Sequence, residues 1–143
     1  MTELSLCMIV KNEEERLARC LSGVQGAVDE IIIVDTGSTD GTKRVAGQFT
    51  SRVYDYAWDD DFSAARNASL DRATKPFILW LDADDVLEEN ALSILYQAAM
   101  RTGAQITSAN HTLFDVERGC RVPVEIEPVV PQPSEIVREI IHM

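Results

Sequence analysis

The stretch Ile78-Leu79-Trp80-Leu81-Asp82-Ala83-Asp84-Asp85 decides the fold of this chain. An apolar run long enough for a buried strand stops abruptly at a group of carboxylates. A strand that ends in Asp-Ala-Asp presents oxygen ligands at the edge of a sheet, and these are the ligands that Mg²⁺ and Mn²⁺ prefer. Two nearby carboxylates also repel each other unless a cation or a proton lies between them. The alternative is an acidic turn that caps the next helix, since such turns are common after strands.

Strands and helices alternate on either side of this stretch. Ile31-Ile32-Ile33-Val34 is apolar throughout and predicts a strand buried on both faces, as in parallel sheets. Helical spacing places Leu17, Cys20, Leu21 and Val24 on one face of a helix. The expected strands are 4–10, 31–34, 52–56, 76–82, 104–114 and 121–130, with helices after residue 12 and at about 42–49, 61–73 and 87–98. This order predicts βαβ units and a mainly parallel sheet.

Local signals mark where some of these helices begin. Asn12, with Glu15 three residues later, resembles a capping box, and Asp61 is expected to cap the helix that follows it. Ser134 is expected to cap a last short helix that includes Ile140 and Ile141 and docks on the sheet or on a second subunit. The prolines between residues 123 and 133 favour edge strands or loops in that segment.

The carboxyl ends of parallel strands share one edge of the sheet, because the crossover connections are right-handed. That edge is expected to bring together Lys11-Asn12, Asp35-Thr36-Gly37 and Asp82-Ala83-Asp84. Ligands bind at this edge in open α/β sheets. Polar strand ends that converge there indicate a binding site more strongly than the acidic stretch alone.

Composition narrows the classes of partner. The chain has 143 residues, 45% of them hydrophobic, which fits one domain with a real core. The formal net charge of −11 argues against nucleic acid or an anionic membrane surface as the main partner. No apolar run is long enough for a membrane span, and the N-terminus lacks the basic region of a signal peptide. Cys7, Cys20 and Cys120 show no C-x-x-C pattern and are expected to be reduced thiols in a cytoplasmic protein.

Motifs in a fixed order resemble those of family 2 glycosyltransferases. Leu6 to Glu14 is similar to their opening strand and turn, and Ile32 to Thr42 is similar to their second-strand motif. Asp61 to Asn67 and Trp80 to Asp85 complete the series. The resemblance covers about residues 4–100 and implies the nucleotide-sugar half of the GT-A fold, an α/β architecture with a mostly parallel sheet flanked by helices.

The resemblance implies one domain over residues 1–143, truncated relative to full-length family members. Its donor-binding half would cover about residues 4–105, followed by an irregular segment over about 106–143. Asp35 would accept a hydrogen bond from the nucleobase, usually uracil, while Val10, Asn12 and Glu13 would belong to the nucleotide-sugar pocket. The alternative roles are a turn for Asp35 and a helix cap for Asn12 with Glu13.

Arg66 would supply the positive charge for the diphosphate, or for a carboxylate that positions it. Phe62, Arg66 and Leu70 are spaced four residues apart, which predicts that Arg66 lies on the apolar face of its helix. The acidic run 59–61 is expected to be a solvated loop with a favourable charge at a helix N-terminus. Gly37 and Gly41 are expected to serve backbone conformation.

The stretch Asp82-Ala83-Asp84 would hold Mg²⁺ or Mn²⁺ beside the nucleotide sugar. Asp84 is the first choice for the metal ligand, and Asp82 would contact ribose or reach the metal through water. Asp85 would help at the same site or cap the next helix. No glycine-rich phosphate loop is present, so diphosphate binding would depend on the metal and a cation.

The resemblance stops after about residue 105. The catalytic base and the acceptor motif of inverting members are not visible, and Glu125 and Glu127 are candidates only because they are acidic. The hypothesis is a metal-dependent glycosyltransferase with a UDP-linked donor and an unknown acceptor. The alternative is a nucleotide-sugar-binding half-domain or fragment without full catalytic activity.

Other classes fit less well. In a phosphatase that uses Asp-x-Asp as nucleophile and acid, the motif ends the first strand, whereas here it ends about the fourth. A dinucleotide oxidoreductase has a glycine-rich turn after the first strand, where this chain has Lys11-Asn12-Glu13. Because family members cover this half-sheet with a further segment, the isolated chain is expected to self-associate through its tail, residues 136–141.

Overall fold

The structure is a computed structural model that describes residues 3–87, 90–103, 106–108, 112–115, 120–123 and 140–142, with side chains described at 3–87 and 90–103. The elements in chain order are β1 (Leu4–Val10), α1 (Glu14–Val24), β2 (Glu30–Asp35), α2 (Thr42–Ala46), β3 (Val53–Asp55), α3 (Phe62–Leu70), β4 (Phe77–Trp80), α4 (Ala91–Thr102), β5 (Ile106–Ser108), β6 (Thr112–Asp115), β7 (Cys120–Pro123) and β8 (Ile140–His142). No helix in these residues is long and apolar enough to cross a membrane.

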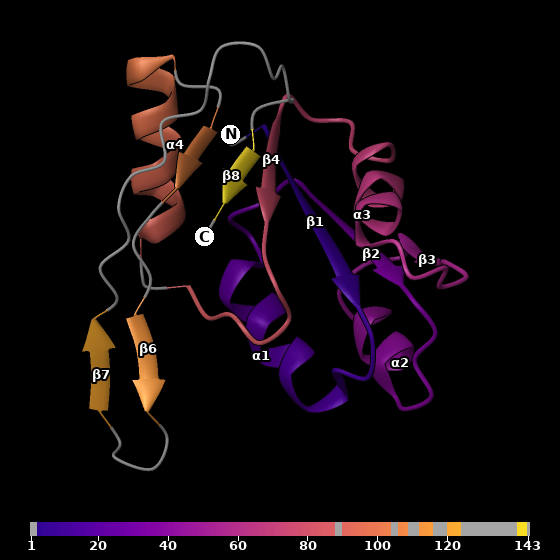
Figure 1. Cartoon of the computed structure of the whole chain (residues 1–143). Helices are drawn as coiled ribbons and strands as arrows, with labels where there is room; N and C mark the ends of the chain where they lie inside the picture. Colours follow the sequence, from indigo (N-terminus) through magenta and orange to yellow (C-terminus); the bar gives the residue numbers. More distant parts are fainter. Residues whose placement is uncertain are drawn as a thin grey trace.

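The main sheet has the strand order β3-β2-β1-β4-β8-β5, and its paired strands run parallel (Figure 1). β6 and β7 form a separate antiparallel pair. In the register of the main sheet, Val10 lies opposite Asp35 and Cys7 lies opposite Trp80. The predicted parallel α/β sheet is therefore confirmed, and the carboxyl ends of β1, β2 and β4 lie along one edge.

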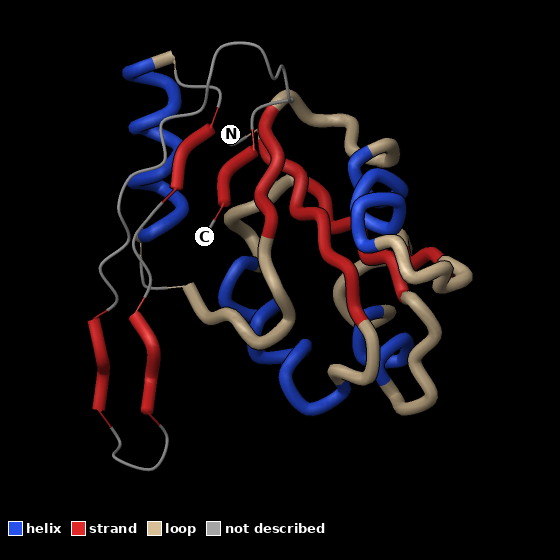
Figure 2. Tube along the Cα trace, in the orientation of Figure 1, coloured by secondary structure: helices blue, strands red, loops and turns tan. Residues whose placement is uncertain are grey.

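Alternation along the strands builds one core on each face of the sheet. On one face, Leu6 and Met8 of β1 pack with α1, whose predicted buried residues Leu17, Cys20, Leu21 and Val24 are all buried. On the other face, Cys7 and Trp80 belong to a smaller cluster that includes Leu70 of α3. Figure 2 shows helices flanking the sheet, so its central strands are covered as a parallel sheet requires.

The predicted capping box at Asn12 is wrong. Helix α1 starts at Glu14, and its cap residue Glu13 makes no side-chain capping bond. Asn12 instead adopts a left-handed conformation with φ 55°, and its Oδ1 accepts a hydrogen bond from Thr39 N at 2.8 Å. A partner distant in sequence has taken the acceptor that a local cap would use. The predicted cap at Asp61 is confirmed, because its side chain accepts from Ala64 N at 3.0 Å.

The predicted last helix is wrong over the residues that the structure describes. Ile140–His142 forms strand β8, which pairs with β4 on one side and β5 on the other. Ser134 and the rest of that predicted helix lie outside the described residues. Since β8 continues the chain's own sheet, this part of the tail does not need a second subunit to be paired.

Candidate functional site

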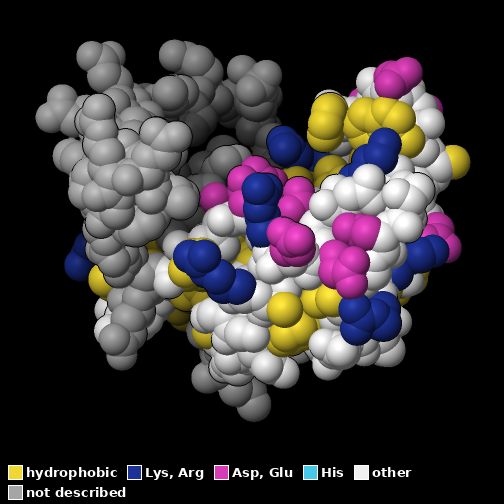
Figure 3. All heavy atoms as spheres, turned by 90° about the horizontal axis from the view of Figure 1, so that it is seen from below, with side chains coloured by type: hydrophobic (Ala, Val, Ile, Leu, Met, Phe, Trp, Pro, Cys, Tyr) yellow, Lys and Arg dark blue, Asp and Glu magenta, His cyan; other side chains and the backbone are white. Residues whose placement is uncertain are grey.

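The edge formed by the carboxyl ends of the strands is the face seen from below in Figure 3, where acidic and basic side chains lie side by side. Asp35 ends β2 at this edge, and the turn that contains Asp82 and Asp84 follows β4. We call this edge the rim. It brings the predicted polar strand ends to one side of the sheet.

Asp35 is 1% exposed, although it is a carboxylate at the end of a strand. Its Oδ1 accepts hydrogen bonds from Gly37 N at 3.0 Å and from Ser38 N at 2.8 Å. Its Oδ2 is buried and has no hydrogen-bond partner among the described residues. Leaving a buried acceptor unpaired is costly, so an oxygen with no donor among the described residues is a candidate to accept a hydrogen bond from a ligand at the rim.

The turn after β1 is tied to the turn after β2. Asn12 N donates to Ser38 Oγ at 2.9 Å, and Glu13 N donates to Thr42 Oγ1 at 2.8 Å. The carbonyl of Val10, whose side chain lies in the core, accepts from Thr36 N at 3.0 Å. The predicted pocket residues at the end of β1 and in the turn after it therefore hold the loop that carries Asp35, through contacts between residues far apart in the sequence.

Glu14 completes this connection, and the sequence analysis did not single it out. Its Oε2 accepts from Gly41 N at 2.9 Å and its Oε1 pairs with Arg44 at 2.8 Å. A Cβ at Gly41 would lie 2.2 Å from Glu14 Oε1, so the glycine is needed for close approach rather than for backbone conformation. Gly37 does serve conformation as predicted, with φ 103°.

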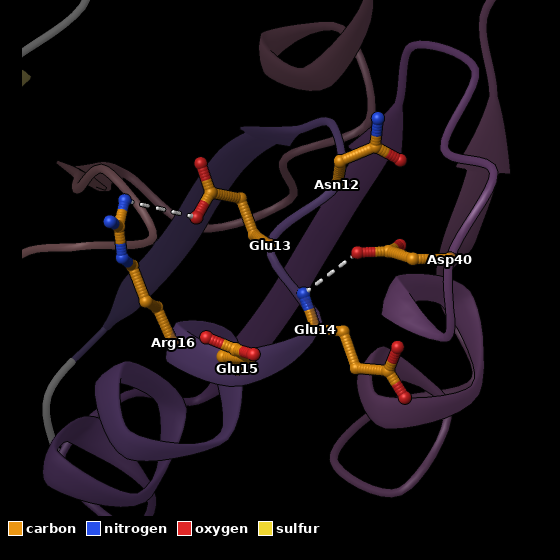
Figure 4. Close-up of a pocket in the computed structure, with 6 residues that line it drawn as sticks. All are labelled: Asn12, Glu13, Glu14, Glu15, Arg16 and Asp40. Carbon is orange, nitrogen blue, oxygen red and sulfur yellow. Dashed lines mark hydrogen bonds and ion pairs between the residues drawn. The ribbon is translucent and has the colours of Figure 1, made fainter.

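A hollow of about 390 Å³ opens where these turns meet (Figure 4). It is lined by Asn12, Glu13, Glu14, Glu15, Arg16 and Asp40. The hydrogen bond from Glu14 N to Asp40 spans the two turns at 3.3 Å, and hydrogen bonds from Thr42 hold the pKa of Asp40 below its ordinary value. This lining is rich in carboxylates, so it repels a diphosphate, and the phosphates must bind elsewhere on the rim.

Arg66 is exposed, and its guanidinium lies 4.3 Å from the centroid of the Trp80 ring. The predicted apolar face of α3 is wrong, because Ala65 and Ser69 are its buried residues and Phe62 is 68% exposed. Arg66 forms no ion pair within the described part of the chain. Its guanidinium group is oriented by a cation–π contact with Trp80. A positioned guanidinium without a carboxylate partner suits an anionic ligand.

The acidic run 59–61 is exposed and precedes helix α3, as predicted, and its side chains also make local contacts. Asp59 accepts from the Tyr56 hydroxyl at 3.1 Å, Asp60 accepts from Trp58 Nε1 at 2.9 Å, and Asp61 caps α3. These carboxylates therefore shape the loop before α3.

Asp82 and Asp84 are exposed, and the residue between them, Ala83, is 5% exposed and packed in the core. Among the described residues neither carboxylate accepts a hydrogen bond, and no three His, Cys, Asp or Glu side chains are grouped to hold a metal. The donor chemistry nevertheless fits Mg²⁺ or Mn²⁺, because such ions bind through one or two carboxylates and take water and substrate phosphate as the remaining ligands.

The buried thiols behave as expected for reduced cysteines. Cys7 and Cys20 are free and buried, and the side chain of Cys120 lies outside the described residues. Burial raises the pKa of Cys20 to about 12, and the charges of Asp85, Asp84 and Asp82 act in the same direction. Burial likewise raises the pKa of Cys7 to about 12. Both thiols therefore keep their protons near neutral pH and remain donors.

Comparison with known proteins agrees with this geometry. The sequence profile described as "Glycosyl transferase family 2" matches residues 5–138. The chain belongs to this glycosyltransferase family.

A TPR repeat-containing protein of Synechococcus elongatus is 49% identical over 61% of this chain and 22% of its own length. The glycosyltransferase SunS of Bacillus subtilis is 38% identical over 55% of this chain and 19% of its own length. The chain thus spans about a fifth of the length of these curated relatives.

Solved structures share the fold. S. aureus TarS (residues 1–349) superposes with a TM-score of 0.66 at 18% identity, covering 76% of this chain and 35% of that one. Glucosyl-3-phosphoglycerate synthase from Mycobacterium tuberculosis, in complex with Mn²⁺ and UDP-glucose, superposes with a TM-score of 0.57 at 22% identity and covers 74% and 43%. At these identities the likeness establishes the GT-A fold of the family.

Proposed function

We propose that this chain is the donor-binding half of a metal-dependent glycosyltransferase that takes a UDP-sugar. The observation that carries the proposal is the buried Oδ2 of Asp35 at the rim, which has no hydrogen-bond partner among the residues that the structure describes. Two structural neighbours support the choice of ligand, since TarS has been solved with UDP and the mycobacterial synthase with Mn²⁺ and UDP-glucose.

The chemistry of the nucleobase favours uracil. Uracil presents an N3–H donor, whereas cytosine presents an unprotonated N3 acceptor at the same position. A carboxylate oxygen only accepts hydrogen bonds at neutral pH, so Asp35 Oδ2 pairs with the first base and repels the second. Because this oxygen is buried in the free molecule, the base can reach it only after a local rearrangement of the rim.

The diphosphate would lie between Arg66 and the exposed carboxylates of Asp82 and Asp84. These carboxylates would hold Mg²⁺ or Mn²⁺, which when bound neutralises charge on the departing nucleoside diphosphate. Arg66, oriented by Trp80, would bind a phosphate oxygen from the other side.

Exchange of one atom at Asp35 tests the proposal. Asp35→Asn can keep the oxygen that accepts from Gly37 and Ser38 and places an NH₂ group where Oδ2 lies. We expect the wild type to bind UDP more tightly than CDP by about tenfold or more, and the variant to lose or reverse that preference. Calorimetric titration in Mn²⁺ measures the affinities for UDP and CDP, with a repeat in EDTA to test the metal.

Asp55→Asn, at the exposed end of the neighbouring strand, is the matched control. An unchanged UDP preference in Asp35→Asn, or equal affinity in EDTA, would contradict the proposal.

The second candidate is a nucleotide-sugar-binding half-domain without full activity. It is favoured by the location of the site, because the rim residues that the structure describes all belong to the predicted donor side. Glu125 and Glu127 lie outside the described residues. A donor-hydrolysis and transfer assay separates the two candidates, since the binding module would bind UDP without turning over a UDP-sugar.

A further inference from the structure

The backbone of Asp82 is held from two directions. From helix α1, Cys20 Sγ donates to the carbonyl of Asp82 at 3.5 Å. From within the turn, Asp85 N donates to the same carbonyl at 3.0 Å, and Asp85 Oδ2 accepts from Asp82 N at 3.2 Å. The backbone N–H and the backbone carbonyl of Asp82 are thus both hydrogen-bonded within the chain.

These contacts fix which way the acidic side chains face. Ala83 packs into the same core cluster as Cys20, while Asp82 and Asp84 on either side of it are exposed. The negative charges of Asp82 and Asp84 repel each other because they are close in sequence. The hydrogen bonds to the backbone of Asp82 hold the turn in place against that repulsion. The third carboxylate of the run is half-buried and directed back onto the backbone of the turn.

We infer that Cys20 and Asp85 are positioning residues that hold the turn 82–85 in the shape in which Asp82 and Asp84 receive a divalent cation. The inference deepens the proposed function, because the cation is the one that the donor diphosphate would share. It also divides the acidic run by role: Asp82 and Asp84 face the ligand, whereas Asp85 acts through the backbone of Asp82.

Amide hydrogen exchange on the ligand-free protein tests the positioning itself. We expect Cys20→Ala to speed exchange of the Asp82 and Asp85 amides by about threefold to tenfold, the size of one lost hydrogen bond, and Cys20→Ser to restore much of the protection. Cys7→Ala is the matched control, because Cys7 is also a buried thiol that donates to a carbonyl, that of Ser69 at 3.7 Å, on the other face of the sheet. Equal effects of Cys20→Ala and Cys7→Ala on these amides would overturn the inference.

Binding of Mn²⁺ in the presence of UDP, followed by electron paramagnetic resonance of free Mn²⁺, tests the assignment of roles. Asp85→Ala should weaken Mn²⁺ binding by about threefold to tenfold, while Asp85→Asn keeps an acceptor for Asp82 N and should bind within about threefold of wild type. Asp84→Asn should lose most of the binding. If Asp85→Asn is as damaging as Asp84→Asn, Asp85 is a ligand and the inference is wrong. A wild type that binds no Mn²⁺ refutes the proposed function, whereas unchanged amide exchange in Cys20→Ala refutes the positioning alone.

Discussion

Strand β2 begins with one acidic residue and ends with another, and the two carboxylates have opposite surroundings. Glu30, at the amino end, accepts from the Ser5 hydroxyl at 2.5 Å, from Thr74 N at 2.6 Å and from Thr74 Oγ1 at 3.0 Å, and it pairs with Arg52. Asp35, at the rim, has one oxygen bonded to backbone amides and the other without any partner among the described residues.

The difference shows how to separate acids that stabilise a fold from acids that await a ligand. The protein supplies donors to both oxygens of Glu30, so that residue connects β1, β2 and the segments before β3 and β4. At the rim no described residue donates to Asp35 Oδ2, and Asp82 and Asp84 are exposed. A buried polar group without a partner is rare enough to need an explanation, and a ligand provides one.

The largest effect expected from this comparison is on stability. Glu30→Ala removes an ion pair and several hydrogen bonds, leaves the Ser5 hydroxyl without its acceptor and takes away the carboxylate that Arg52 pairs with, which should lower the free energy of unfolding by about 2–4 kcal/mol. Asp84→Ala removes a side chain that bonds nothing in the described part of the chain and should change it by less than about 0.5 kcal/mol. Urea denaturation monitored by circular dichroism measures both. Similar losses in the two variants would remove the distinction between the two edges.

The reverse pattern is expected for ligand binding. Asp84→Ala should weaken UDP binding in Mn²⁺ by about tenfold or more, equivalent to about 1.4 kcal/mol. Glu30→Gln, at the opposite edge of the sheet, should bind UDP like the wild type at a temperature where it is folded. Calorimetry with both variants decides the matter, and a weaker affinity in Glu30→Gln would show that the two edges are energetically coupled.

Much of the fold and part of the site could be predicted because they depend on local sequence patterns. The apolar run of β2 and the helical spacing of Leu17 and Leu21 gave the sheet and α1, and the strand ends placed Asp35 and Asp82 at one rim. The helix predicted for the tail is wrong because Ile140 and Ile141 fit the periodicity of a helix as well as that of a strand, and only pairing with β4 and β5 selects the strand.

The contacts that were missed join residues far apart in the sequence. The local pattern predicts a cap at Asn12 because its actual partner, Thr39, lies 27 residues away. The same is true of Cys20 with Asp82, separated by 62 residues, and of Glu30 with Thr74, separated by 44. A single sequence carries no signal for such pairs, since each member alone looks like an ordinary core or surface residue.

Glu14 sharpens the comparison, because it lies at the rim yet resembles Glu30 in being fully bonded. Gly41→Ala would place a Cβ against its carboxylate and displace the bonds to Gly41 N and Arg44. We expect a loss of about 1 kcal/mol in unfolding free energy and a weaker affinity for UDP, because the loop that carries Asp35 is held by the same connection. Gly23→Ala in α1 is the matched control, since nothing lies within 4 Å of its Cβ and alanine favours a helix. Equal stability of the two variants would mean that Glu14 moves aside at no cost.

The smallest effect expected is the dependence of stability on pH that Glu30 contributes. Burial alone would raise its pKa, but hydrogen bonds from Ser5 and Thr74 and the charge of Arg52 outweigh burial and lower the pKa below its ordinary value. A carboxyl whose pKa is lower in the folded chain binds its proton more tightly when unfolded, so its stabilising contribution is complete above the unfolded pKa of about 4.3 and is lost as the pH falls through the folded pKa. The difference in unfolding free energy between wild type and Glu30→Gln should therefore be constant from pH 7 down to about 5 and shrink below about pH 4.

Thr74→Val, which removes one of the hydrogen-bond donors to Glu30, should reduce that pH dependence without abolishing it. A difference that stays constant down to pH 3 would show that Glu30 stabilises the sheet through packing rather than through its charge.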